Sequence, residues 1–149
     1  MSIWWSLHLR REAASVPLAR RLLLGTMETA GVDPDVSYEL SVALTEACAN
    51  AVEHGGRGSE GAGPAGAAYR VTAYLDGETC RIEVADSGPG FPGVELPAAP
   101  SDAEHGRGLR LIEELADHVQ FGNRSGRGGA VVSFDKILKW KDSPSLLLA

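Results

Sequence analysis

Two alternating segments on either side of the dipeptide Asp76-Gly77 constrain the fold of this chain most. Apolar and polar residues alternate over residues 69–75 and again over residues 78–85, which is the period of a strand with one buried face. An Asp-Gly pair between two such segments favours a tight hairpin. The sequence therefore predicts two adjacent antiparallel strands, and the other segments have to pack against the buried face of their sheet.

Two amphipathic helices are predicted before this hairpin. Ser15 is a good N-cap residue, and an apolar stripe at helical spacing runs from there to Gly31. Asp33-Pro34 is a second start signal, and the helix that follows is expected to end at His54. The core candidates on this second helix are Val36, Leu40, Leu44, Ala47, Cys48 and Ala51.

The remaining segments complete a β-α-α-β-β-α-β-β order. Residues 2–9 alternate like a strand, residues 108–118 have helical spacing, and residues 119–121 and 130–134 form a second predicted hairpin. This order favours an α+β fold, a two-layer α/β sandwich in which the helices cover one face of the sheet. We expect one domain over residues 1–136, a flexible Gly-rich loop at 55–68, and a tail at 137–149 that is a frayed end or a small packing patch.

Charge and cysteine content exclude several classes of function. The formal net charge of -6, with no run of more than two basic residues, disfavours direct binding of nucleic acid. Cys48 and Cys80 are isolated, so neither a disulfide framework nor a zinc site is expected. No window approaches the roughly 20 apolar residues of a membrane span. A soluble cytoplasmic protein without membrane contact is the expectation.

The second predicted helix carries three polar residues at a spacing of four. Glu46, Asn50 and His54 share one side of it, away from the apolar stripe. Such a ridge is commonly the solvated side of an amphipathic helix. Asn50 is unusual there, because asparagine is a mediocre helix former and its side-chain carbonyl is a competent ligand for Mg²⁺. The ridge by itself leaves both interpretations open.

A second motif, Asp86-Ser-Gly-Pro-Gly-Phe, follows the predicted strand 78–85. A turn is the simplest interpretation, because Asp, Gly and Pro are turn residues. The motif also suits a pocket for a flat ring with an exocyclic amine. The Asp86 carboxylate can accept a hydrogen bond from the amine, and Gly88 and Gly90 let the ring approach the backbone.

A third motif, with Gly106 and Gly108, enters the third predicted helix. Glycines at such a place leave backbone N–H groups open at the positive end of the helix dipole, where phosphate oxygens bind well. The segment is not a P-loop, because no Gly-Lys-Ser/Thr occurs. It is not a Rossmann turn either, because position 111 is Leu and no βαβ unit is closed.

In this order the three motifs resemble the N, G1 and G2 boxes of the GHKL ATPases, which have the Bergerat, or histidine-kinase-like ATPase, fold. The separations suit that family, with 36 residues from Asn50 to Asp86 and 20 from Asp86 to Gly106. The flanking segments ELSVALTEACANAVEHG, RIEVADSGPGF and GRGLRLIEELADHV are similar to its anti-sigma-factor serine kinases. A histidine kinase, or a gyrase-, Hsp90- or MutL-type member, is not expected, because little chain precedes the first motif and the segment 91–105 is short.

The resemblance implies a role for each motif residue. Asn50 would coordinate Mg²⁺ on the phosphates, and Asp86 would bind the adenine amino group. Glu46 would be the catalytic base that takes the proton of a serine hydroxyl. His54 would cap its helix or contact phosphate. The other ATP-binding residues implied are Gly88, Gly90, Gly106, Arg107, Gly108 and Leu109, with Arg107 neutralising the γ-phosphate.

The resemblance also implies cofactors and partners. These are ATP and Mg²⁺, a sigma factor, a STAS-domain anti-anti-sigma protein as the substrate of a serine kinase, and a second copy in a homodimer. Arg20 and Arg21 are the partner-binding candidates, although they also fit a solvated helix face. One departure is Gly128-Gly129-Ala130, which lacks the threonine of many relatives. The alternative function is therefore a nucleotide-binding module that sequesters a sigma factor or other regulator with weak or no kinase activity.

Overall fold

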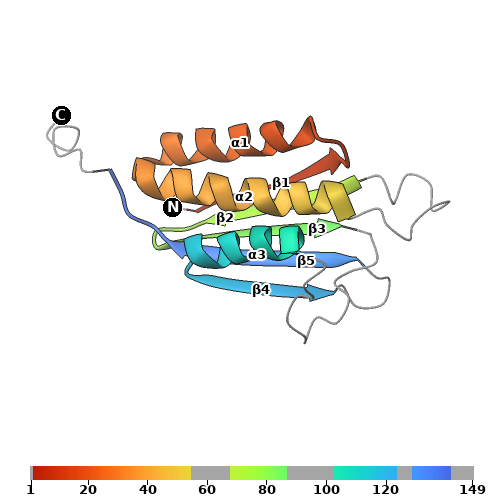
Figure 1. The fold of residues 1–149 in the computed structure, drawn as a ribbon. Helices are drawn as coiled ribbons and strands as arrows, with labels where there is room; N and C mark the ends of the chain where they lie inside the picture. Colours follow the sequence, from red (N-terminus) through yellow and green to blue (C-terminus); the bar gives the residue numbers. More distant parts are fainter. Residues whose placement is uncertain (1, 55–67, 87–102, 124–128, 142–149) are drawn as a thin grey trace, which may run out of the picture.

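The computed structural model describes residues 2–54, 68–86, 103–123 and 129–141. Its elements are β1 Ile3–Arg10, α1 Ser15–Ala30, α2 Pro34–His54, β2 Ala68–Leu75, β3 Thr79–Asp86, α3 Ala103–Leu115, β4 His118–Asn123 and β5 Ala130–Ile137 (Figure 1). This is the order that the sequence predicts. The predicted loop at 55–68 lies outside the described residues, except for residue 68, and so do Gly88 and Gly90.

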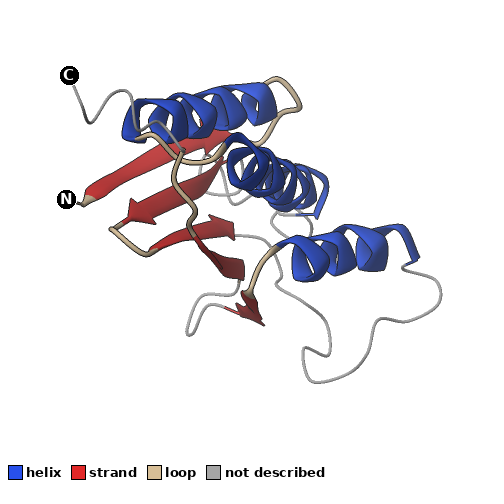
Figure 2. Ribbon diagram, turned by 90° about the vertical axis from the view of Figure 1, so that its left-hand side faces the viewer, coloured by secondary structure: helices blue, strands red, loops and turns tan. Residues whose placement is uncertain are grey.

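The five strands form one antiparallel sheet in the order β1-β2-β3-β5-β4. The three helices lie side by side on one face of this sheet (Figure 2). The predicted two-layer α+β sandwich is therefore confirmed. Because β5 inserts between β3 and β4, the end of β3 lies beside the start of β5, and the register pairs Ala85 with Val131.

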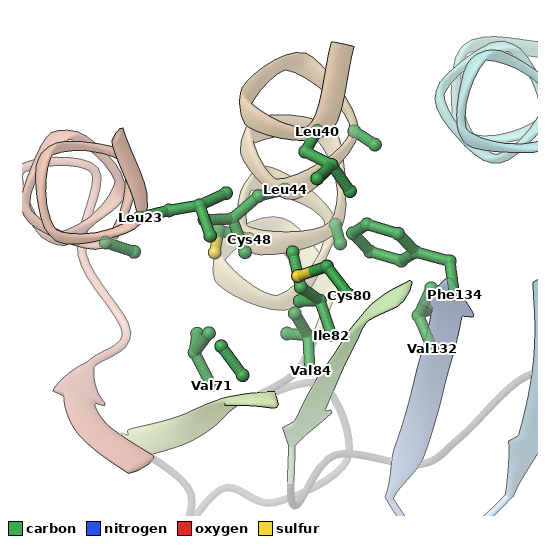
Figure 3. Close-up of a cluster of buried hydrophobic side chains, with 14 of the residues drawn as sticks. Leu23, Leu40, Leu44, Cys48, Val71, Cys80, Ile82, Val84, Val132 and Phe134 are labelled. Atoms are coloured by element: carbon green, nitrogen blue, oxygen red, sulfur yellow. The ribbon is translucent and has the colours of Figure 1, made fainter. Parts of the chain in front are cut away.

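The core lies between the helices and the inner face of the sheet. Leu23 of α1, Leu44 of α2, Ile82 of β3 and Phe134 of β5 are fully buried there (Figure 3). Burial of such a side chain contributes about 1.5–3 kcal/mol. The six core residues predicted on α2 are all buried, namely Val36, Leu40, Leu44, Ala47, Cys48 and Ala51.

Helix α1 begins differently from the prediction. The cap position is Ala14, which makes no side-chain capping bond, so the prediction of Ser15 as N-cap is wrong. The Ser15 hydroxyl donates to the Glu12 carbonyl at 2.7 Å and lies 2.6 Å from the Tyr69 hydroxyl of β2. Ser15 is buried, and its hydroxyl joins the start of α1 to the sheet. Gly31, with a φ of 89°, ends the helix as predicted.

The β2–β3 hairpin is confirmed, but its turn lies one residue later than predicted. The Asp76 N–H donates to the Thr79 carbonyl at 3.0 Å, so Gly77 and Glu78 are the central residues. Gly77 does not have a positive φ. The Asp76 carboxylate accepts the N–H groups of Thr79 and Glu78, and these bonds lower the pKa of Asp76. The aspartate therefore shapes this turn through its side chain.

The chain after β5 remains part of the fold beyond residue 136, where the sequence predicts the domain to end. Leu138 is buried in the core, and Trp140 pairs with Val32 in an isolated β-bridge. Two further backbone bonds hold this segment, from Asp33 N–H to the Lys139 carbonyl at 2.7 Å and from Lys141 N–H to the Gly31 carbonyl at 2.8 Å. Residues 138–141 are thereby fixed to the loop between α1 and α2. Within the described ranges, no helix is long and apolar enough to cross a membrane.

Candidate functional site

The elements that carry the three motifs meet at one end of the sandwich. The C-terminal ends of α2 and β3 and the N-terminal end of α3 all lie at the right-hand end of Figure 1. Helix α2 packs against both α3 and β3. The fold thus brings together motifs that are 20 to 36 residues apart in the sequence.

Asp86 is the most buried of the polar motif residues whose side chains the structure describes. Its side chain is 6% exposed, and its Oδ1 accepts a hydrogen bond of 3.1 Å from the N–H of Ala130. A buried carboxylate is costly unless it has such partners. Gly129, immediately before Ala130, has a φ of 99°, which side chains rarely adopt. This glycine leads the chain into β5 where the Ala130 amide meets Asp86.

Glu46 and Asn50 are half-buried on the side of α2 that faces α3. The direction follows from Glu39, which is two helical turns before Glu46 and so lies on the same side. Its Oε1 is 3.4 Å from Lys136 Nζ, which donates to the Leu115 carbonyl at the end of α3 at 2.6 Å. Glu46 and Asn50 lie away from the apolar stripe, as predicted, but on the side of α2 that faces a neighbouring helix.

Helix α3 begins at Ala103, so the prediction that Gly108 enters the helix is wrong. In a helix whose first residue is Ala103, the N–H groups of residues 103–105 have no intrahelical partner, and the N–H of Gly106 is the first to donate within the helix. Gly106 is in this first turn, whereas Gly108 and Leu109 are in the second. The side chains of residues 103–107 lie outside the described residues, and with them that of Arg107.

Packing does not require a glycine at position 108. A Cβ atom built on it meets no atom within 4 Å, and its φ is not positive. The next residue, Leu109, is half-buried and packs against the core. The described structure around Gly108 therefore gives no packing reason for a glycine at this position.

Arg11 contacts the end of α2, and the sequence does not reveal this contact. Its Nη1 donates a hydrogen bond of 2.9 Å to the carbonyl of Val52 in the last turn of α2. The last carbonyls of a helix lack intrahelical partners, and a cation there also opposes the negative end of the helix dipole. Arg11 therefore supports the turn that follows Asn50. The side chain of His54, the other candidate for this cap, lies outside the described residues.

Arg20 and Arg21 are exposed on α1, and the fold does not bring them to the other candidates. Helix α1 packs on β1 and α2, on the side away from α3. Arg21 borders a groove of about 640 Å³ with Leu18 and Leu22. The contact of Arg20 and Arg21 with a partner protein stays a prediction.

Comparison with known proteins agrees with this arrangement. Residues 9–136 match the histidine kinase-like ATPase domain. The chain belongs to this family. It is 31% identical over 129 residues to the serine-protein kinase RsbW of Bacillus pumilus, and 30% identical over 135 residues to that of Bacillus licheniformis. These matches cover 80% and 83% of this chain and 78% of each relative.

Two solved structures share the fold. One contains the RsbU and RsbW domains of Rv1364c from Mycobacterium tuberculosis, with a TM-score of 0.64 and 20% identity over 92% of this chain. This chain spans only 34% of that one. The other is the SiaB-SiaC complex from Pseudomonas aeruginosa, with a TM-score of 0.59 and 12% identity, covering 89% of this chain and 88% of that chain. At these identities the likeness concerns the fold alone.

Proposed function

We propose that this chain binds ATP with Mg²⁺ and transfers the γ-phosphoryl group to a serine of a STAS-domain anti-anti-sigma protein, acting as the anti-sigma factor of a partner-switching system. The observation that carries the proposal is the buried Asp86 carboxylate, held by Ala130 at the end of the sandwich where α2 and α3 meet. Membership of the ATPase family and the likeness to kinases named RsbW support it.

Asp86 is suited to recognise adenine. A carboxylate has about four acceptor sites on two oxygens, so it can bind the Ala130 N–H and accept the exocyclic amine of adenine as well. Its low exposure would favour a ligand that donates a hydrogen bond at this place. Gly88 and Gly90 would border the same pocket.

The phosphates would lie between α2 and the start of α3. A phosphate contact from the Gly106 N–H requires the first turn of α3 to open, because this N–H is the first intrahelical donor of a helix that begins at Ala103. Contacts from the N–H groups of Gly108 and Leu109 require α3 to begin later when nucleotide is bound, because in this structure both residues lie inside the helix. Arg107 would supply a positive charge to the γ-phosphate.

Asn50 would hold Mg²⁺ through its side-chain oxygen. No group of three His, Cys, Asp or Glu residues within the described part of the chain could hold a metal ion. Mg²⁺ usually binds few protein ligands and completes its octahedron with water and phosphate oxygens. When bound, Mg²⁺ would screen the phosphate charge.

Glu46 would act as the catalytic base. It lies one helical turn before Asn50 on the same half-buried side of α2. The serine oxygen of the partner would form a bond to the γ-phosphorus as the bond from that phosphorus to the bridging oxygen breaks and ADP leaves. Glu46 would take the hydroxyl proton.

Partner binding would involve a sigma factor, the STAS-domain protein and a second copy of the chain, with Arg20 and Arg21 as contacts. The second candidate function is sequestration of a sigma factor or other regulator without phosphoryl transfer. One observation favours it: the residue whose N–H donates to Asp86 is Ala130, which has no hydroxyl to offer to a bound nucleotide. Without this hydroxyl, phosphoryl transfer from ATP would be slow or absent.

Transfer of label from γ-labelled ATP to candidate STAS-domain proteins separates the two functions. We expect a labelled serine with the wild-type chain, and loss of labelling but unchanged ATP affinity with Glu46→Gln. Glu28→Gln, which changes an exposed glutamate of α1, is the control. Intact ATP binding without transfer to any STAS protein would leave sequestration as the function. Transfer by Glu46→Gln at the wild-type rate would refute the assignment of the base.

Substitution of Asp86 tests the adenine assignment. Asparagine keeps one acceptor oxygen for the Ala130 N–H, so Asp86→Asn should fold normally. Its NH₂ group would then face the donor amine of adenine, and ATP affinity should fall at least about tenfold, or about 1.4 kcal/mol. Asp86→Ala leaves the Ala130 amide buried and unsatisfied, which costs about 1–3 kcal/mol of stability as well. Unchanged ATP affinity in Asp86→Asn, measured by calorimetry, would exclude Asp86 as the adenine ligand.

A further inference from the structure

An apolar groove of about 420 Å³ lies between the second half of α1 and the first half of α2. It is lined mainly by Leu24, Val32, Pro34, Tyr38, Ser41 and Lys141. Two of its apolar residues remain open to solvent, Leu24 with 37% and Tyr38 with 67% exposure. The groove is at the end of α1 and α2 opposite to the end where the elements that carry the three motifs meet (Figure 1), so it is separate from the proposed nucleotide site.

The chain itself leads to this groove. The bridge between Val32 and Trp140 and the bond from Lys141 N–H to the Gly31 carbonyl fix the last described residues against the α1–α2 loop. Lys141 then lines the groove. The sequence that follows it is Asp-Ser-Pro-Ser-Leu-Leu-Leu-Ala, at 142–149. An apolar triplet therefore follows within a few residues of an apolar groove.

We propose that Leu146, Leu147 and Leu148 of the same chain pack into this groove. Five residue steps separate Lys141 from Leu146, which span up to about 16 Å at about 3.3 Å per residue. This span is long enough to reach the groove, because the tail begins at Lys141 on its rim. Packing there removes the leucines from water and covers Leu24 and Tyr38. The polar residues 142–145 provide the connection.

The packing is intramolecular. A tail attached at the rim has a high effective concentration at the groove, which favours it over a segment of another molecule. The groove is also a poor fit for a charged segment, since its lining includes one acidic and one basic residue, Glu28 and Lys141. The inference is independent of the kinase proposal, and ATP binding should not depend on the tail.

A disulfide trap tests the contact in the full-length chain. Glu28→Cys with Leu147→Cys places a thiol at the groove and one on the tail, and Glu12→Cys with Leu147→Cys is the matched control. Both glutamates are exposed, and Glu12 lies beyond the other end of α1, more than about 20 Å from Glu28 at 1.5 Å per residue. The native thiols are buried. Under mild oxidation we expect the first pair to form a disulfide at least about tenfold faster, within single chains. Equal rates for the two pairs would overturn the proposal.

Mixing experiments distinguish the tail of the same chain from that of a second copy. A chain with only Glu28→Cys and a chain with only Leu147→Cys should cross-link to each other far more slowly than the double variant closes. If they cross-link as fast, the occupant is a second copy and intramolecular packing is refuted.

Hydrogen exchange provides an independent readout. Serine at all three positions, 146 to 148, keeps the length of the tail and removes its apolar side chains. We expect the amides of residues 22–30 in the second half of α1 to exchange about tenfold faster in this variant, while ATP affinity stays unchanged. Identical exchange in the two proteins would show that the leucines do not cover the groove.

Discussion

Gly108 provides the sharpest test of how the fold and the nucleotide site are related. It lies inside α3, where an added Cβ atom meets no atom within 4 Å. Alanine in a helix interior is more favourable than glycine by about 0.5–1 kcal/mol. Gly108→Ala should therefore stabilise the nucleotide-free protein and raise its melting temperature by about 2–4 °C.

The same substitution should weaken ATP binding. If phosphate contacts at Gly108 require α3 to begin later than Ala103, alanine opposes this change by favouring the helix, and its methyl group also occupies the space beside the backbone. We expect affinity to fall about tenfold, equivalent to about 1.4 kcal/mol. Higher stability with lower affinity is an unusual combination, and a damaged fold cannot produce it.

Gly25 is the matched control, because it is a helical glycine of α1 with no atom within 4 Å of an added Cβ. Gly25→Ala should raise the melting temperature by a similar amount without changing ATP affinity. Thermal unfolding without nucleotide and titration calorimetry with Mg²⁺–ATP measure both effects. Wild-type affinity in Gly108→Ala would refute the assignment of this motif to the phosphates, and a lower melting temperature would refute the packing argument.

Two further perturbations test the supports of the fold. Arg11→Met removes the charged donor from the Val52 carbonyl, so the free energy of unfolding in urea should fall by about 1–2 kcal/mol. The exposed control Arg10→Met should lose less than about 0.5 kcal/mol. Equal losses would contradict the role of Arg11 as a helix cap. Burial raises the pKa of the Cys48 and Cys80 thiols from 9.0 to about 12. The folded state then keeps protons that the unfolded state loses, so the contribution of the two thiols to the free energy of unfolding should be constant below about pH 9 and fall as pH rises towards 12. A profile that stays flat over this interval in chemical unfolding would contradict it.

The order of the elements and most of the core could be predicted from the sequence, because both follow from periodicity. The stripe on α2 has a period that only a helix satisfies, and its six predicted core residues are buried. The resemblance of the three motifs likewise predicts the family that the comparison shows. The strand order β1-β2-β3-β5-β4 was not predicted, since it depends on which edges meet in space.

The errors arise where a residue has two possible local roles. Serine is a favoured N-cap residue, but the Ser15 hydroxyl bonds to Tyr69, a contact across 54 residues. Gly108 is typical of a helix entrance, yet α3 begins five residues earlier. Arg11 meets Val52 across 41 residues and is only a member of a short basic pair in the sequence. The contacts of Ser15 and Arg11 join residues far apart in the chain, so no local sequence pattern predicts them.

One side of α2 packs in the core, and the other carries the proposed functional residues. The proposed function can therefore be tested without damage to the fold. Leu44 and Cys48 are completely buried, so their substitution would create cavities and lower stability. Glu46 and Asn50 are half-buried on the side towards α3 and are absent from the hydrophobic core. A loss of activity from changes at these two positions therefore reports on chemistry. The exception is the last turn, where Arg11 binds the backbone of the helix, so stability and the position of Asn50 change together there.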